Sequence, residues 1–226
     1  MTDRPFEHGP AYHVGRDALT EKEIDMVITA LGSIAETTLL EFAISTGMRR
    51  DDIVNTRIAD IQEISEAGQP GPPAIYVTYW EKKRRRYWHA HVSGPTAQHV
   101  LMLVNLYKQQ RLRTPWLFPS PRDPQHHLSS RQAYNVFQKA LKVAGLRSRP
   151  FHALRATCMK QCKRMGWTIE QTMELTGDSF RTVQEHYLTP SIDEMKEVAV
   201  KAPPVRFGAF DRLRGLKPLV PEKETK

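Results

Sequence analysis

The sequence has 226 residues, which suits one sizeable domain with appendages or two small domains. Its apolar fraction of 40% is enough for a hydrophobic core and excludes wholesale disorder. Lys and Arg number 33 against 25 Asp and Glu, and the resulting net charge of +8 favours an anionic partner such as nucleic acid or an acidic membrane surface.

The first half of the chain predicts two helices and a small sheet. Residues 1–17 are polar and without periodicity. A capping box of Thr20 and Glu23 starts a helix in "TEKEIDMVITAL", and "AETTLLEFAISTGMRRDDIV" predicts a second helix that ends at Gly47 before a new helical start. The alternation in "TRIADIQEI" (56–64) predicts a strand. "AIYVTYW" and "RYWHAHV" then flank "EKKRR" and predict a β-hairpin with a basic tip.

From Pro95 onwards the patterns are helical. Helices are expected over residues 96–111, 129–146, 151–165, 168–176, 179–188 and 191–201. Capping boxes mark three of their starts, at Ser129–Gln132, Thr168–Gln171 and Ser191–Glu194. The tail from Pro203 is basic and weakly patterned. The fold class predicted is α+β and mostly α, with one small sheet.

The remaining composition indicates an intracellular, soluble protein. The two cysteines, Cys158 and Cys162, lie four residues apart on one expected helix, and we expect them to be small core residues, since such a pair alone makes neither a disulfide framework nor a four-ligand zinc site. There is no apolar run long enough for a membrane span and no signal-peptide pattern. We therefore expect a cytoplasmic protein.

Four short segments carry charged or nucleophilic side chains at positions of interest: "STGMRRDDI", "EKKRRR", "RPFHALRAT" and "ELTGDSFRTVQEHYLTP". Each alone has an ordinary structural explanation: a capping arginine, a solvated turn, a polar helix surface and a helix-turn-helix with a buried tyrosine. In the third segment His152 and Arg155 are three residues apart, so on the expected helix their side chains lie on the same face.

Together, the order and spacing of these segments resemble the catalytic domain of the tyrosine recombinases, also called the phage integrase family. The family's first-arginine segment, T-G-x-R-x-x-E/D-(I/L), is matched by Thr46, Gly47, Arg49, Asp52 and Ile53. A hairpin lysine and the His-x-x-Arg pair His152 and Arg155 follow. A Leu-x-Gly turn then precedes the tyrosine, matched by Leu175, Gly177 and Tyr187. The resemblance covers residues 18–190 and implies a three-stranded antiparallel sheet at one edge of the domain.

The resemblance implies a DNA strand-transfer chemistry that needs neither ATP nor a metal or other cofactor. Arg49 and Arg155 would clamp the non-bridging oxygens of a phosphodiester, because guanidinium forks fit phosphate. Tyr187 would attack the phosphorus and form a phosphotyrosine, and His152 would take its proton or orient the phosphate. A hairpin lysine would protonate the leaving 5′ oxygen. The family pattern favours Lys83, whereas Lys82, one residue away, would face the opposite side of the strand.

The sequence departs from the family at Asp178, where a histidine or tryptophan usually donates to the phosphate. A carboxylate only accepts hydrogen bonds. Its place before "SFRTVQEHYL" favours a helix N-cap turned away from the phosphate. It could instead pair with His152 or an arginine, or His186 could supply the missing donor. In a further alternative the enzyme is slow or has lapsed into a DNA-binding protein.

The expected organisation is an irregular lead (1–17), a catalytic domain (18–190), and a C-terminal helix and basic tail (191–226). The family's N-terminal DNA-binding domain would need about 80–100 residues before Thr20, more than the short lead of this sequence, so we expect either a catalytic fragment or a reduced enzyme. By the resemblance, we expect the C-terminal segment to pack either on a neighbouring subunit or within its own chain. The partners implied are double-stranded DNA and further copies of the chain, from dimer to tetramer, with no membrane. Two other functions stay open, a non-catalytic DNA-binding regulator and a type IB topoisomerase.

Overall fold

The computed structural model of the protein describes residues 17–64, 72–82 and 84–188. They belong to a first compact unit, Met1–Thr189. The second unit, Pro190–Lys226, lies outside the described residues, and so do the helix predicted over 191–201, its capping box and the basic tail.

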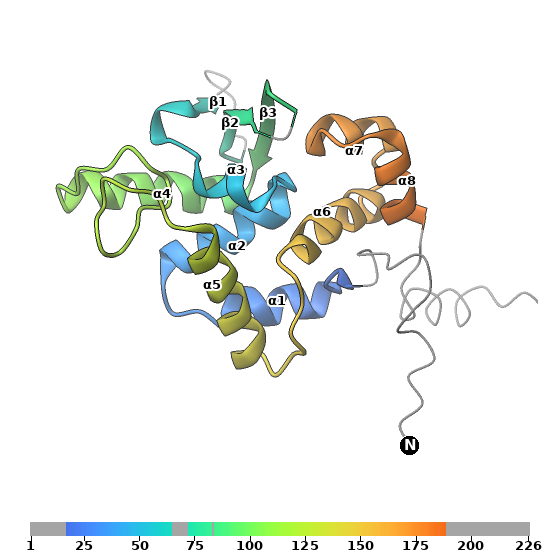
Figure 1. Ribbon diagram of the computed structural model, residues 1–226, viewed down its shortest axis with the longest axis horizontal. Helices are drawn as coiled ribbons and strands as arrows, with labels where there is room; N and C mark the ends of the chain where they lie inside the picture. Colours follow the sequence, from blue (N-terminus) through green and yellow to red (C-terminus); the bar gives the residue numbers. More distant parts are fainter. Residues whose placement is uncertain (1–16, 65–71, 83, 189–226) are drawn as a thin grey trace, which may run out of the picture. The chain divides into compact units, whose positions relative to one another are not determined.

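The fold is mostly helical and is built around one buried helix (Figure 1). Its α-helices are α1 (Glu21–Thr29), α2 (Ile34–Thr46), α3 (Arg50–Val54), α4 (Pro95–Gln109), α5 (Ser130–Val143), α6 (His152–Arg164), α7 (Ile169–Thr176) and α8 (Phe180–Leu188). No residue of helix α2 is exposed, and its buried side chains include Leu39, Leu40 and Phe42. A helix with no solvent-facing side is surrounded by protein, and α2 accordingly contacts α1, α3, α4, α5, α6 and β3.

A three-stranded antiparallel sheet lies at one edge of the helices, as predicted (Figure 1). Its strands are β1 (Ile61–Ile64), β2 (Ala74–Glu81) and β3 (Arg86–Ser93), in the order β1-β2-β3. The facing pair Val77 and Ala90 is fully buried, whereas the next exposed pair toward the tip, Trp80 and Tyr87, faces solvent. Period-two alternation therefore sets one face of the hairpin against the helices.

The strand predicted over residues 56–64 is too long at its start. Residues Ile58–Asp60 form a 3₁₀ turn and only Ile61–Ile64 pairs with β2. The preceding backbone pairs elsewhere, because Ile58 N–H donates to the Pro115 carbonyl (2.9 Å) and Thr56 O accepts from Leu117 N–H (3.0 Å). The alternating pattern was real, but its first residues pair with a distant loop instead of the sheet.

Local signals in the sequence are confirmed where the structure describes them. The capping boxes Thr20–Glu23, Ser129–Gln132 and Thr168–Gln171 are all formed. The two cysteines are free and buried in the core, as expected. In the described ranges no helix has both the length and the apolarity to cross a membrane, and the same residues hold no group of three or more potential metal ligands.

Gly47 provides a test of how closely α2 approaches α6. Its φ of +59° is left-handed, and an added Cβ would lie 3.0 Å from both Cys158 Sγ and Thr176 Cγ2. Gly145 is also left-handed (φ +69°) but has open space around it. We expect Gly145→Ala to cost about 1–2 kcal/mol from backbone strain alone, and Gly47→Ala to cost about 1–3 kcal/mol more from overpacking.

Urea unfolding of both variants measures this difference. Equal losses in the two variants would mean that the Gly47 neighbours can move aside freely.

Candidate active site

Arg49 is positioned by the break between α2 and α3. Gly47 ends α2 in the left-handed conformation, and Arg49 then takes an extended backbone as the residue before α3. Its guanidinium lies between two carboxylates: Nη1 donates to Glu81, and Nη2 donates to Asp178 Oδ1 at 3.1 Å. The side chain is 22% exposed, so Arg49 faces both the protein and the solvent.

Arg155 approaches the same carboxylate from α6. Its Nε donates to Asp178 Oδ2 at 2.9 Å, and Nη2 lies 2.6 Å from the same oxygen. The rest of the guanidinium is held by backbone, since Nη1 donates to the Gly47 carbonyl and Nη2 to the Thr176 carbonyl (2.9 Å). The two arginines, far apart in sequence, therefore converge on one anion, each through its own carboxylate oxygen.

Asp178 does not cap helix α8. The cap is made by the next residue, because Ser179 Oγ accepts from Thr182 N–H at 3.4 Å and the Ser179 carbonyl accepts from Val183 N–H. The prediction of a capping aspartate turned away from the site is wrong, and the alternative of an aspartate paired with arginine describes the structure. The reason is electrostatic: a buried guanidinium requires a counter-ion, and Asp178 is the carboxylate within reach of both arginines.

The charges around Asp178 decide its protonation state. Burial by itself raises the pKa of this carboxyl group. The hydrogen bond from Arg155 and the charges of Arg155, Arg49 and His152 outweigh burial and lower the pKa below its usual value. Asp178 is therefore ionised at neutral pH. His152, the exposed first residue of α6, lies within electrostatic reach of Asp178.

Sequence reasoning missed Glu81, the last residue of β2. Its carboxylate has no exposure to solvent and holds three guanidiniums: Arg49, Arg86 through Oε2 at 3.0 Å, and Arg84 with Nε at 4.0 Å. The one signal in the sequence was an acidic residue beside a basic run, which describes any solvated turn equally well. The contact between Glu81 and Arg49 is formed only in the folded chain.

The hairpin is also bonded to the turn that carries Asp178. Arg86 Nη2 donates to the Gly177 carbonyl at 3.4 Å, and Trp88 Nε1 donates to the Glu174 carbonyl at 3.1 Å. The Arg86 guanidinium lies over the Trp88 ring, 3.7 Å from its centroid, a cation–π geometry. The basic hairpin and the α7–α8 turn are thus one connected structure.

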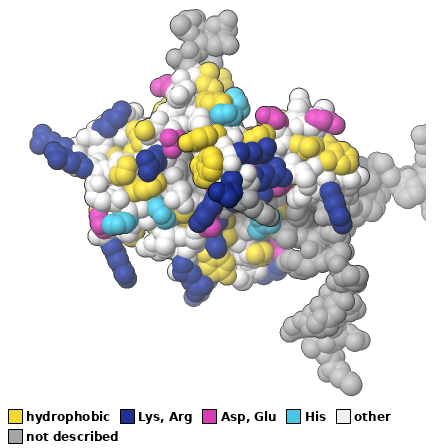
Figure 2. Space-filling view, turned by 45° about the horizontal axis from the view of Figure 1, so that its top comes forward, with side chains coloured by type: hydrophobic (Ala, Val, Ile, Leu, Met, Phe, Trp, Pro, Cys, Tyr) yellow, Lys and Arg dark blue, Asp and Glu magenta, His cyan; other side chains and the backbone are white. Residues whose placement is uncertain are grey.

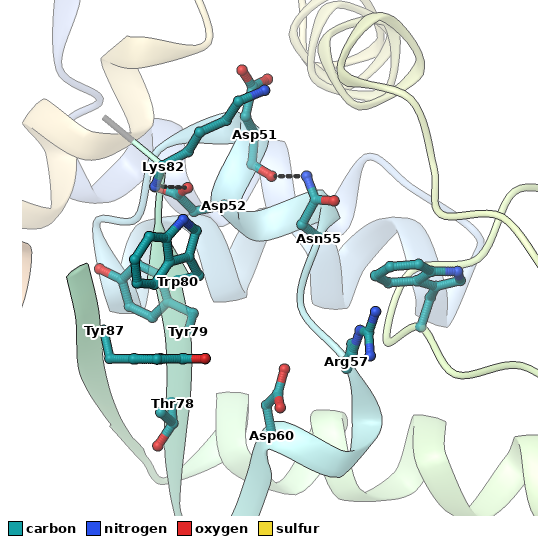
Figure 3. Close-up of a pocket in the computed structure, with 11 residues that line it drawn as sticks. Asp51, Asp52, Asn55, Arg57, Asp60, Thr78, Tyr79, Trp80, Lys82 and Tyr87 are labelled. Atoms are coloured by element: carbon teal, nitrogen blue, oxygen red, sulfur yellow. Dashed lines mark hydrogen bonds between the residues drawn. The ribbon is translucent and has the colours of Figure 1, made fainter. Parts of the chain in front are cut away.

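A pocket of about 590 Å³ lies between α3, the hairpin and Trp116, and neither Arg49 nor Arg155 lines it (Figure 3). Its lining includes Asp52, whose pKa is raised by burial and by the nearby charge of Glu81, against the opposing influence of the Lys82 backbone and two arginines. Lys82 N–H makes a long contact to Asp52 Oδ1 (3.5 Å), and the Lys82 side chain extends towards Asp51 (Figure 3). Lys82 thus lines this pocket.

The structure does not describe the side chains of three predicted site residues. Lys83 lies outside the described residues. Tyr187 and His186 belong to helix α8, but their side chains are likewise outside the described part of the chain. The structure thus brings together Arg49, His152, Arg155 and Asp178.

The surface around the sheet is rich in positive charge. In Figure 2, Lys and Arg side chains gather near the middle of the face turned forward, beside exposed apolar side chains. The basic hairpin residues Arg84 and Arg85 are exposed. A surface of this kind suits a polyanion that runs across it.

Sequence comparison identifies the family. Residues 17–192 match the phage integrase family. The chain belongs to this family. No curated protein sequence matches it significantly.

Solved structures of phage integrase relatives have the same fold. XerA recombinase aligns with a TM-score of 0.64 at 17% identity, covering 84% of this chain and 66% of that one. XerH site-specific recombinase, in a post-cleavage complex with its palindromic difH substrate, gives 0.63 at 16% identity, covering 83% and 52%. A lambda integrase dimer bound to a COC′ core site gives 0.57 at 18%, covering 75% and 47%. The chain thus spans between about half and two thirds of these structures, and at such identities the likeness is one of fold.

The lowered pKa of Asp178 makes stability depend on pH. Because its pKa is lower in the folded than in the unfolded protein, Asp178 stabilises the fold above the unfolded value of about 3.9, and this contribution is lost as pH falls through the folded pKa. We expect the free energy of unfolding to fall more steeply between about pH 4 and pH 2 in the wild type than in Asp178→Asn.

Chemical unfolding from pH 7 to pH 2 measures both slopes. Asp51→Asn, which removes an exposed carboxylate from α3, is the control and should keep the wild-type slope. If Asp178→Asn keeps the wild-type dependence of the free energy of unfolding on pH, Asp178 is not the group responsible for it.

Proposed function

We propose that this protein is a site-specific DNA recombinase that cleaves and rejoins DNA strands through a 3′-phosphotyrosyl intermediate. The observation that carries the proposal is the convergence of Arg49 and Arg155 on one two-oxygen anion. A phosphodiester also offers two non-bridging oxygens, and forked guanidiniums bind such oxygens in a defined orientation. Membership of the phage integrase family supports the same chemistry.

Each residue in the proposed reaction has a defined task. The arginines hold the two non-bridging oxygens and stabilise the charge that builds up in the transition state, and a preorganised donor of this kind is worth about 10²–10³ in rate. The Tyr187 hydroxyl attacks the phosphorus and loses its proton to His152. The bond from phosphorus to the 5′ oxygen breaks, and a hairpin lysine, Lys83 in preference to Lys82, protonates that oxygen. Rejoining runs the same steps backwards, so the phosphotyrosine conserves the bond energy.

The partners we propose are double-stranded DNA and further copies of the chain. Related structures include lambda integrase as a dimer on a core site and as a tetramer on a Holliday junction. We assign catalysis to residues 18–190 and contact with a neighbouring subunit to residues 191–226. We place this activity in the cytoplasm of the host cell, where the protein would act on DNA.

A lapsed, DNA-binding member of the family is the second candidate. The observation that favours it is Asp178, because a carboxylate between the arginines takes the place in which a phosphate would bind. Covalent adduct formation separates the two candidates.

The first test uses nicked suicide duplexes that carry candidate attachment sites. We expect the wild type to form a covalent protein–DNA adduct on a denaturing gel and Tyr187→Phe to form none, because phenylalanine has no nucleophilic oxygen. Tyr134→Phe removes a hydroxyl from α5 and should leave the adduct unchanged.

An adduct in Tyr187→Phe would identify a different nucleophile. A wild type that binds these duplexes without any adduct would support the lapsed protein.

The second test assigns the leaving-group acid. A 5′-bridging phosphorothiolate expels a thiolate, which needs no proton because a thiol has a much lower pKa than an alcohol. We expect Lys83→Ala to lose at least about 10²-fold in cleavage rate on ordinary DNA, the lower end of general acid catalysis, and to regain it on the phosphorothiolate. Lys82→Ala is the matched control and should show no such rescue.

Rescue of Lys82→Ala instead would move the acid to the neighbouring residue. Rescue of neither variant would remove the hairpin lysines from this role.

A further inference from the structure

We propose that Asp178 is an internal competitor of the DNA phosphate: its carboxylate occupies the anion site between Arg49 and Arg155, and it must leave before a phosphodiester can bind there. This inference rests on the proposed function, because it concerns the same two arginines. The inference adds that the anion site is closed by Asp178 until DNA displaces this side chain.

The first argument is the engagement of Arg155. All three nitrogens of its guanidinium have partners: Nε and Nη2 contact Asp178, Nη2 also donates to the Thr176 carbonyl, and Nη1 donates to the Gly47 carbonyl. The side chain is 2% exposed. An arginine bound in this way cannot present a fork to a phosphate. The edge now facing Asp178 is the edge that such a fork requires.

The second argument is charge. The carboxylate is ionised and its side chain only 7% exposed, so a phosphate oxygen placed beside it would meet a like charge in a poorly solvated site. Glu81 already engages the other side of Arg49. The arginines therefore bind either Asp178 or a phosphate at this edge, and simultaneous binding is unfavourable.

The third argument is that the turn carrying Asp178 is held by side chains of the basic hairpin. Gly177, between α7 and Asp178, has a left-handed backbone (φ +69°), and its surroundings are side chains of the hairpin, Trp88 and Arg86. Arg86 in turn is held by Glu81, the same carboxylate that holds Arg49. A DNA backbone that drew Arg86 away from Glu81 and the Gly177 carbonyl would loosen the turn and release Asp178. The closed site would thereby open on contact of the hairpin with DNA.

A fixed supporting role for Asp178 makes the opposite prediction. If the carboxylate only holds the two guanidiniums in orientation, its removal loosens them and weakens anion binding. If it competes, its removal strengthens anion binding. Binding of inorganic phosphate, which requires neither a DNA site nor catalysis, separates the two roles.

The experiment measures the affinity of the full chain for inorganic phosphate by calorimetry, and follows the Arg155 Nε–H signal by NMR. We expect Asp178→Asn to bind phosphate at least about tenfold more tightly than the wild type, because a charge-assisted fork becomes available. Asp51→Asn makes the same change of charge on the neighbouring α3 and should stay within about twofold of the wild type, since exposed charges are screened. The double variant Asp178→Asn/Arg155→Gln should lose the gain.

Three results would contradict the proposal that Asp178 competes with phosphate. They are unchanged or weaker phosphate binding in Asp178→Asn, an equal gain in Asp51→Asn, or a gain that survives in the double variant. If thermal melting shows that Asp178→Asn is unfolded, Asp178→Ser makes the same comparison with a smaller side chain.

The suicide duplex keeps the two proposals apart. Tighter phosphate binding in Asp178→Asn without an adduct from any variant would support competition by Asp178 and contradict the recombinase function. An adduct from the wild type, with no gain in phosphate binding on removal of Asp178, would support the recombinase function and contradict competition by Asp178.

Discussion

The buried guanidinium of Arg155 is the interaction on which the rest of the site depends. A charge with almost no exposure is tolerated only where hydrogen bonds and a counter-ion replace its lost hydration. Three segments provide them: the end of α2 through Gly47 O, the end of α7 through Thr176 O, and the following turn through Asp178. Because Arg155 must satisfy all its donors at once, it fixes these segments relative to α6. The same bonds bring Arg49, two residues after Gly47, to the opposite oxygen of Asp178.

The close approach of α2 to α6 has a local origin. Gly47 ends α2 with a conformation that costs other residues free energy, and its lack of a side chain admits Cys158 and Thr176 to within contact distance. A larger residue would separate the two helices and take the Gly47 carbonyl away from Arg155. The glycine in the "STGMRRDDI" segment thus stops a helix and also sets the spacing of the arginine pair.

The sequence predicted those features that local physics determines. Capping boxes, the hairpin and the helix-ending glycine each depend on neighbouring residues, and all were confirmed where described. Arg49 and Arg155 were predicted as a pair by family resemblance and lie together around one carboxylate. Glu81 could not be recognised, because its role depends on a contact with Arg49 across 32 positions of sequence. For the same reason Asp178 was assigned to a local cap: its partners lie 129 and 23 positions away.

The carboxylates around the arginines explain how a cluster of guanidiniums is stable in the folded protein. Arg49, Arg86 and Arg155 face the buried carboxylates of Glu81 and Asp178, and without these acids the mutual repulsion of the arginines would oppose folding. A diester phosphate carries one negative charge, as the Asp178 carboxylate does, so an exchange between them leaves the net charge of the site unchanged. The exchange resembles the release of counterions when a basic protein binds DNA, except that the displaced ion belongs to the protein. In the proposed exchange, the cost would be the movement of the α7–α8 turn into water, and contacts of the basic hairpin with DNA would offset that cost.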